Sequence, residues 1–153
     1  MFRKRGREFG YDLFQYLDEN GKSCRVGSAD VNQYLKEITG QEFTAKEFRT
    51  WSGTVLMARE LNECGPFDSP TDAKRKVVGA VKAVSQKLGN KPATCRAYYI
   101  HPRVIDAYMA NELPGLKDLA RNSASEADLS PEELCVLQLI AASTSKESGK
   151  TAA

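Results

Sequence analysis

The apolar residues of this chain recur at helical spacing in five segments. Apolar positions that repeat three and four residues apart lie on one face of an α-helix. Small polar residues or proline precede most of these segments and glycine follows several of them, as is typical of helix ends. The pattern predicts helices over residues 29–39, 45–62, 70–88, 102–109 and 131–142.

Two short segments near the N-terminus predict a β-hairpin instead. Residues 13–17 and 24–26 alternate weakly between apolar and polar side chains. Residues 18–21, Asp-Glu-Asn-Gly, are typical of a tight turn between two strands. The fold class predicted from these patterns is mainly α, with one short N-terminal β-hairpin.

Individual side chains predict where the helices begin and which faces they bury. We expect Ser28 to cap the first helix, and Thr44 with Glu47 fits a capping box at the start of the second. Serine–proline pairs precede the third and the last helices. The apolar residues on the predicted faces are Val31, Leu35, Ile38, Phe48, Trp51, Val55, Leu56, Ala58, Val77, Val81, Val84, Leu88, Leu134, Leu137 and Ile140.

The same patterns divide the chain into three parts. Residues 1–10 are basic, polar and broken by glycine, so we expect a disordered or truncated start there. Residues 11–142 hold the apolar segments and are expected to form one domain, which lacks part of its beginning. Residues 143–153 are rich in Ser, Thr, Lys and Ala and are expected to be a disordered tail.

Composition excludes several classes of protein and leaves others open. The chain is 41% apolar and carries 22 basic against 20 acidic residues, a net charge of +2 that does not by itself indicate nucleic acid. Its four scattered cysteines and single histidine argue against a metal site and for reduced thiols in the cytoplasm. No apolar run reaches the roughly 20 residues of a membrane span. Without a heptad pattern, we expect a monomer.

Two stretches could carry chemistry, residues 43–51 and 88–102. The second holds two adjacent tyrosines and the only histidine. A tyrosine phenol has an ordinary pKa near ~10, so it attacks a phosphodiester only where nearby groups offset the developing charge. Arginine suits that purpose because its guanidinium is always charged and binds two phosphate oxygens at once.

The chain has residues of these types at Lys46, Arg49, Asn90 and Tyr99. Lys46 and Arg49 are three residues apart and share one helical face, Asn90 follows a glycine that ends a helix, and Tyr99 comes nine residues later. None of these features is specific alone. A Lys–Arg pair on a helix is usually a solvated face, and a tyrosine pair is usually part of a core and its rim.

Together, these motifs resemble type IB DNA topoisomerases of the bacterial and poxvirus-like kind, over roughly residues 11–112. In that family, and in the related tyrosine recombinases, a Lys or His precedes a catalytic Arg by three residues. A Leu-Gly-His or Leu-Gly-Asn follows, and the nucleophilic Tyr comes nine residues after its last member. Lys46, Arg49, residues 88–90 and Tyr99 match in type, order and spacing.

The resemblance implies the C-terminal helical portion of the topoisomerase IB and tyrosine recombinase catalytic fold. It implies that Tyr99 attacks one strand of double-stranded DNA and forms a 3′-phosphotyrosyl link. Arg49 would then stabilise the transition state, Asn90 would donate to a phosphate oxygen, and Lys46 would contact the DNA backbone. Supercoils would relax without ATP, metal or another cofactor, in a cytoplasmic protein associated with the nucleoid.

Four neighbouring residues were weighed for the same roles. Tyr98 has the wrong spacing from Asn90 for the nucleophile. His101 lies past the nucleophile, so we interpret it as an entry residue of the next helix. Tyr108 and Cys95 are expected to pack in the core.

The chain departs from the family at its N-terminal side. The resemblance implies another catalytic arginine and a hairpin lysine that protonates the leaving oxygen, and neither is recognisable in residues 1–10. An upstream polypeptide that completes the active site is therefore one expected partner, and weak activity of the chain alone is expected. Two alternatives stay open, an inactive or DNA-binding remnant and a recombinase-like strand transferase.

Overall fold

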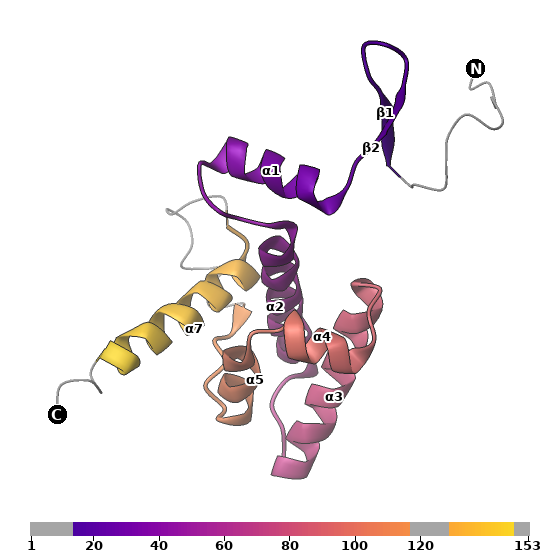
Figure 1. Cartoon of the computed structure of the whole chain (residues 1–153). Helices are drawn as coiled ribbons and strands as arrows, with labels where there is room; N and C mark the ends of the chain where they lie inside the picture. Colours follow the sequence, from indigo (N-terminus) through magenta and orange to yellow (C-terminus); the bar gives the residue numbers. More distant parts are fainter. Residues whose placement is uncertain (1–13, 117–128, 149–153) are drawn as a thin grey trace. The chain divides into compact units, whose positions relative to one another are not determined.

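The computed structural model describes residues 14–116 and 129–148, and this part of the chain is mainly helical. The predicted fold class, including the hairpin, is confirmed. The chain has two compact units, Met1–Phe48 and Arg49–Ala153, which are described separately. The elements labelled in Figure 1 are β1 (Gln15–Leu17), β2 (Ser23–Arg25), α1 (Ser28–Thr39), α2 (Ala45–Cys64), α3 (Pro70–Lys87), α4 (Pro92–Tyr98), α5 (Pro102–Met109) and α7 (Pro131–Ser148).

The hairpin of the N-terminal unit forms where the turn signal predicted it. Strands β1 and β2 are antiparallel, with Tyr16 opposite Cys24. The Asp18 carboxylate accepts hydrogen bonds from the backbone N–H groups of Asn20 (3.0 Å) and Lys22 (2.9 Å). Gly21 completes the turn at φ +75°, a conformation that glycine adopts without strain.

Helix α1 begins one residue earlier than predicted. Gly27, not Ser28, is its N-cap, because the Asp30 carboxylate accepts the Gly27 N–H at 2.7 Å and so fixes Gly27 outside the helix. No residue of α1 is buried, and the side chains of Val31 and Ile38 are 40% and 60% exposed. The apolar face that the sequence predicted is present, but it covers no core in this unit.

Helix α2 begins with the predicted Thr44–Glu47 pairing. The Glu47 carboxylate accepts hydrogen bonds from the Thr44 N–H (2.8 Å) and the Thr44 hydroxyl, which lowers the pKa of Glu47. Phe48 was expected to face the core, and that expectation is wrong. Its side chain is 49% exposed and meets the edge of Phe43 at 6.3 Å between ring centroids.

The C-terminal unit holds the buried core, and α3 contributes as predicted. Val77, Val81 and Val84 are all buried, and the Ser69 hydroxyl caps α3 by accepting the Asp72 N–H at 3.2 Å. In this unit α4 lies beside α3, and α5 packs against both α3 and α7 (Figure 1). The sequence assigned no element to residues 92–98, where Pro92 opens the short helix α4.

Helix α7 buries only part of the predicted face. Leu134 is partly buried and Ile140 packs against the core, but Leu137 is 42% exposed. The fully buried residues are Cys135, Val136 and Leu139, none of which belongs to the predicted face. The helix also runs to Ser148, past the boundary at residue 142, while residues 1–13 and 149–153 lie outside the described part of the chain.

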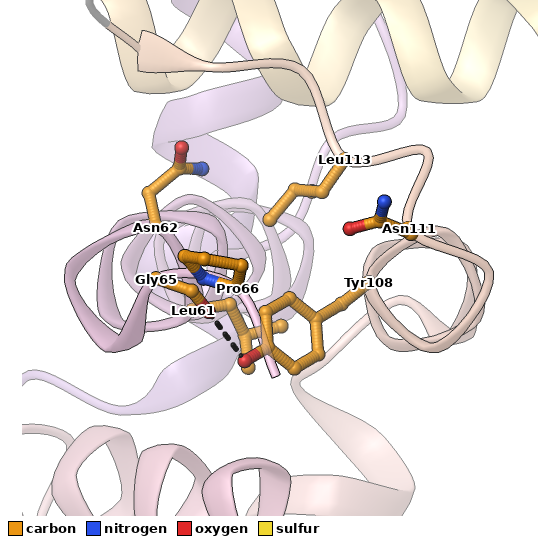
Figure 2. Close-up of a pocket in the computed structure, with 7 residues that line it drawn as sticks. All are labelled: Leu61, Asn62, Gly65, Pro66, Tyr108, Asn111 and Leu113. Carbon is orange, nitrogen blue, oxygen red and sulfur yellow. Dashed lines mark hydrogen bonds between the residues drawn. The ribbon is translucent and has the colours of Figure 1, made fainter. Parts of the chain in front are cut away.

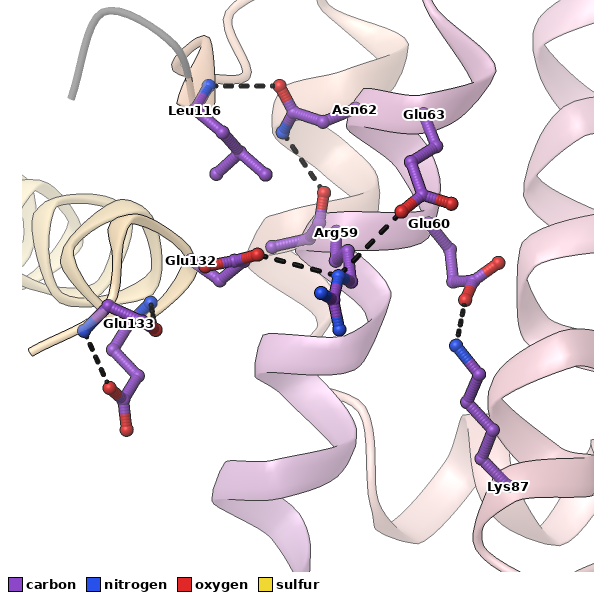
Figure 3. Close-up of polar contacts among 10 residues, drawn as sticks. Arg59, Glu60, Asn62, Glu63, Lys87, Leu116, Glu132 and Glu133 are labelled. Atoms are coloured by element: carbon purple, nitrogen blue, oxygen red, sulfur yellow. Dashed lines mark hydrogen bonds and ion pairs between the residues drawn. The ribbon is translucent and has the colours of Figure 1, made fainter. Parts of the chain in front are cut away.

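Polar contacts tie α2 to its neighbours on both sides (Figure 3). Arg59 lies 3.7 Å from Glu63 on the same helix and 3.5 Å from Glu132 of α7. Glu60 pairs with Lys87 at the end of α3, at 2.6 Å. Because Lys87 directly precedes the turn that carries Asn90, these contacts lie close in sequence to the candidate site. In residues 14–116 and 129–148, no helix is long and apolar enough to cross a membrane.

Candidate active site

Arg49 of α2 reaches the turn that follows α3. Its Nη2 donates one hydrogen bond to Asn90 Oδ1, at 2.7 Å, and another to the Leu88 carbonyl oxygen. Gly89 reverses the chain at φ +66°, and the Asn90 N–H then bonds back to the Ser85 carbonyl at 2.9 Å. The Leu-Gly-Asn segment is thus a helix end that presents both a carbonyl and an amide side chain to one guanidinium.

The same guanidinium lies over the ring of Tyr99. The Arg49 Cζ atom is 5.1 Å from the ring centroid, within the range of a cation–π contact. The Arg49 Nε is buried without a hydrogen-bond partner among the described residues. Arg49, Asn90 and Tyr99 were singled out from the sequence, and the structure brings these three together.

Tyr99 differs sharply from the tyrosine that precedes it. It is the C-cap of α4, with its N–H bonded to the Cys95 carbonyl at 2.9 Å, and its side chain is partly buried against the core. The Tyr98 side chain is 62% exposed. In the described part of the chain, the Tyr99 hydroxyl has no hydrogen-bond partner.

Lys46 lies in the first turn of α2, in the N-terminal unit, and is exposed. The boundary between the two units falls between Lys46 and Arg49. The site described here therefore comprises Arg49, Asn90 and Tyr99, all of the C-terminal unit.

The structure also tests the interpretations of three residues near this site. His101 is the N-cap of α5, and its Nδ1 accepts the Arg103 N–H at 3.3 Å, as expected of a helix-entry residue. Cys95 is buried, and burial raises the pKa of its thiol, while the Arg49 charge lowers it less. Tyr108 is buried with its hydroxyl bonded to the Gly65 carbonyl at 2.8 Å. All three predictions are confirmed.

Two residues that contact the Tyr99 segment were not singled out from the sequence. Gly53 lies against the Tyr99 carbonyl, and the Thr54 hydroxyl accepts the His101 N–H at 3.0 Å. A glycine in the middle of a predicted helix costs about 1 kcal/mol relative to alanine, so it calls for a packing reason. A glycine inside the predicted helix 45–62 was therefore a sign in the sequence that Gly53 makes a close contact.

A separate pocket of about 250 Å³ lies at the other end of α2 (Figure 2). Leu61, Gly65, Tyr108 and Leu113 are among the residues that line it, and the dashed contact joins Tyr108 to Gly65. None of the three candidate site residues lines this pocket. In the described residues, no group of three His, Cys, Asp or Glu side chains is arranged to hold a metal ion.

Comparison with known proteins identifies the family to which this chain belongs. Residues 1–122 match the family model described as the catalytic core of eukaryotic DNA topoisomerase I. The chain belongs to the type IB DNA topoisomerase family. It is 29% identical over 109 residues to the DNA topoisomerase 1B of Acanthamoeba polyphaga mimivirus. That match covers 67% of this chain and 32% of the viral topoisomerase, so the chain spans about a third of this relative's length.

Proposed function

We propose that this chain is the nucleophile-bearing part of a type IB DNA topoisomerase. It would break one strand of double-stranded DNA through Tyr99 and relax supercoils without ATP, a metal ion or another cofactor. The observation that carries the proposal is the position of Arg49, which stacks on Tyr99 and bonds to Asn90. A phosphate held by Arg49 and Asn90 would therefore lie close to the tyrosine.

In the proposed reaction, the Tyr99 phenol oxygen attacks phosphorus as its proton leaves. The bond between phosphorus and the 5′-oxygen breaks, and that oxygen takes up a proton to become a 5′-hydroxyl. The product is a 3′-phosphotyrosyl link, and attack by the 5′-hydroxyl reverses each step and reseals the strand. Because the phosphotyrosyl ester conserves the energy of the phosphodiester, neither strand breakage nor resealing needs another energy source.

Arg49 would stabilise the negative charge that collects on the phosphate oxygens in the transition state. Its Nη2 supplies both hydrogen bonds to residues 88 and 90, so the Nη1 donors remain for a phosphate. The Asn90 amide accepts from Arg49 through Oδ1, which leaves its Nδ2 to donate to a non-bridging oxygen. Arg49 thus both binds the phosphate and orients the second donor.

Lys46 and an upstream polypeptide complete the proposal. Lys46 would contact the DNA backbone, as the resemblance implies. The arginine and the lysine acid that the resemblance places upstream would come from that polypeptide. General acid help is typically worth about 10²–10⁴-fold, so the chain alone would relax DNA slowly. We place the active protein on DNA in the cytoplasm, as a monomer.

The decisive experiment is detection of a covalent protein–DNA adduct in EDTA. A pool of duplexes would carry a 5′-bridging phosphorothiolate with randomised flanking bases, because a thiolate leaves without needing a proton. We expect an adduct with the wild type and Tyr98→Phe, and none with Tyr99→Phe. Relaxation of negatively supercoiled plasmid would be measured in parallel.

The same experiment separates the proposal from its rivals. DNA binding that weakens steeply with salt, without an adduct from any variant, would overturn strand breakage and leave a DNA-binding remnant. An adduct that persists in Tyr99→Phe would place the nucleophile elsewhere. Plasmid relaxation at the rate of a complete family enzyme would contradict the need for an upstream polypeptide.

A further inference from the structure

The backbone of Tyr99 lies directly against helix α2, at Gly53. A Cβ atom built on Gly53 would overlap the Tyr99 carbonyl oxygen, and it would come within 3.2 Å of the Tyr99 carbonyl carbon and the Leu88 Cδ1. Real side chains do not tolerate the first contact, because a backbone carbonyl cannot move aside like the end of a flexible side chain. Only glycine at position 53 allows Tyr99 to lie this close to α2.

One turn of α2 also holds the segment on either side of Tyr99 by hydrogen bonds. The Thr54 hydroxyl donates to the Thr50 carbonyl at 2.7 Å and accepts the His101 N–H at 3.0 Å, and the Thr54 side chain is only 1% exposed. The Thr50 hydroxyl donates to the Tyr98 carbonyl at 3.3 Å. Three residues within five positions of α2 therefore contact the backbone of residues 98–101.

We propose that Gly53 and Thr54 are positioning residues that set the place of Tyr99 relative to Arg49. Arg49 lies on the same helix, one turn before Gly53 and Thr54. The Arg49 guanidinium and the residues that contact the Tyr99 backbone thus belong to the same helix, α2. Helix α2 therefore sets the distance between the backbones of the proposed nucleophile and of the phosphate-binding residue before DNA arrives.

The catalytic part of this inference rests on the proposed function. Reacting atoms must approach to about 3–3.5 Å in good alignment, and a misplacement of about 1 Å can cost about 10²-fold in rate. An alanine at position 53 would push the Tyr99 carbonyl away by a displacement of that order. We expect Gly53→Ala to lower the rate of adduct formation about 100-fold, with little change in DNA affinity.

Gly79 of α3 provides a matched control for this substitution. It is also a glycine in a helix, but a Cβ there would meet nothing within 4 Å. Gly79→Ala should raise the thermal midpoint slightly, because alanine is the better helix former. It should leave adduct formation unchanged.

At Thr54, two conservative variants separate the hydroxyl from the shape of the side chain. Thr54→Val keeps the shape but leaves the His101 N–H without its acceptor, whereas Thr54→Ser keeps the hydroxyl. We expect adduct formation to fall at least 10-fold in Thr54→Val and to stay within about threefold of the wild type in Thr54→Ser. A merely structural role would lower the thermal midpoint of both variants without separating their rates.

A readout that needs no activity tests the positioning itself. The Tyr99 ring current should shift the Arg49 Nε–H resonance in an NMR spectrum of the 16.9 kDa chain, because the guanidinium lies over the ring. We expect this resonance in Gly53→Ala and Thr54→Val to move toward its position in Tyr99→Leu, which lacks the ring. If the wild type forms no adduct, the proposed function fails, but this shift still decides the positioning.

The inference is overturned if the Arg49 resonance and the adduct rate of both Gly53→Ala and Thr54→Val match the wild type. It is also overturned if Gly79→Ala moves either readout as much as Gly53→Ala does. Should Thr54→Val not fold, Thr50→Val removes only the hydroxyl that contacts the Tyr98 carbonyl. That variant should show a smaller shift in the same direction, and an unchanged resonance would count against the proposal.

Discussion

Two tyrosines of the C-terminal unit, Tyr108 and Tyr99, lie in different surroundings. Tyr108 of α5 is buried, its hydroxyl bonds to the Gly65 carbonyl, and its ring lies 5.5 Å from that of Phe67. Tyr99 at the end of α4 is partly exposed, its hydroxyl has no partner among the described residues, and its ring contacts the Arg49 guanidinium.

The difference separates a structural tyrosine from the proposed nucleophile. A buried hydroxyl without a partner destabilises a fold, so Tyr108 is satisfied by a carbonyl that holds it in place. A nucleophile must instead reach a group that is absent from the free protein. The Tyr99 backbone is held by α2, and its hydroxyl makes no hydrogen bond with the described residues, which agrees with the proposed role of a nucleophile.

The sharpest test of this comparison removes each hydroxyl in turn. Tyr99→Phe should abolish adduct formation and leave stability nearly unchanged, because the hydroxyl makes no hydrogen bond with the described residues. Tyr108→Phe should keep adduct formation but lower the free energy of unfolding by about 1–3 kcal/mol, because the Gly65 carbonyl loses its donor. Urea unfolding and the adduct assay measure both. If Tyr108→Phe stays fully folded but forms no adduct, the two tyrosines do not have the different roles described above.

The next largest effect should come from the cation over Tyr99. Arg49→Lys keeps the charge but loses the planar donors that bind the Asn90 amide and a phosphate together. We expect adduct formation to fall about 10²–10³-fold, the loss typical of a missing transition-state donor. Arg103→Lys is the matched control, since Arg103 also has a buried Nε without a partner among the described residues. If Arg103→Lys lowers adduct formation as much as Arg49→Lys does, the loss comes from disturbed packing and not from a missing phosphate donor.

The side chains of the candidate site were easier to predict from the sequence than the residues that support them. Arg49, Asn90 and Tyr99 were singled out because their types, order and spacing resemble the motif of the type IB family, and the structure brings these three residues together. Their supports were missed because backbone contacts leave little trace in side-chain identity. Gly53 carried the one available signal, an unfavourable residue inside a helix.

In the fold as well, features set by neighbouring residues were predicted better than features set by contacts between distant parts of the chain. Helix ends at α2, α3 and α5 were predicted because capping residues act within one turn. The prediction for α7 was wrong at Leu137, because the surrounding helices decide which apolar residues of a helix enter the core. The short helix α4 was missed because seven residues are too few to show a period.

Alkaline pH should test the buried region and not the site. Burial and the nearby Glu132 charge raise the pKa of Cys135 from an ordinary 9.0 to about 11, and burial also raises the pKa of Tyr108. Above pH 9 the unfolded chain loses the thiol proton while the folded chain keeps it. Stability is therefore highest below pH 9 and falls as pH rises toward 11, by about 2–3 kcal/mol for a shift of this size.

Urea unfolding between pH 8 and 11, with Cys135→Ala alongside, measures that slope (the pH range brackets the ordinary and raised pKa values). The variant should lose stability at pH 8 but show a flatter decline above pH 9. An equally steep decline in the variant would assign the pH dependence to Tyr108 or to other groups.

The smallest effect concerns what holds the Asn90 turn in place. Glu60 and Lys87 are 2.6 Å apart, and their side chains are 15% and 49% exposed, so solvent screens the pair. Glu60→Gln should lower the free energy of unfolding by less than about 1 kcal/mol, and less still at high salt. It should leave adduct formation within about twofold, because the Asn90 N–H is held by the Ser85 carbonyl and its side chain by Arg49. A tenfold loss would mean instead that the ion pair positions the turn, and that the Tyr99 region depends on surface charge as well as on α2.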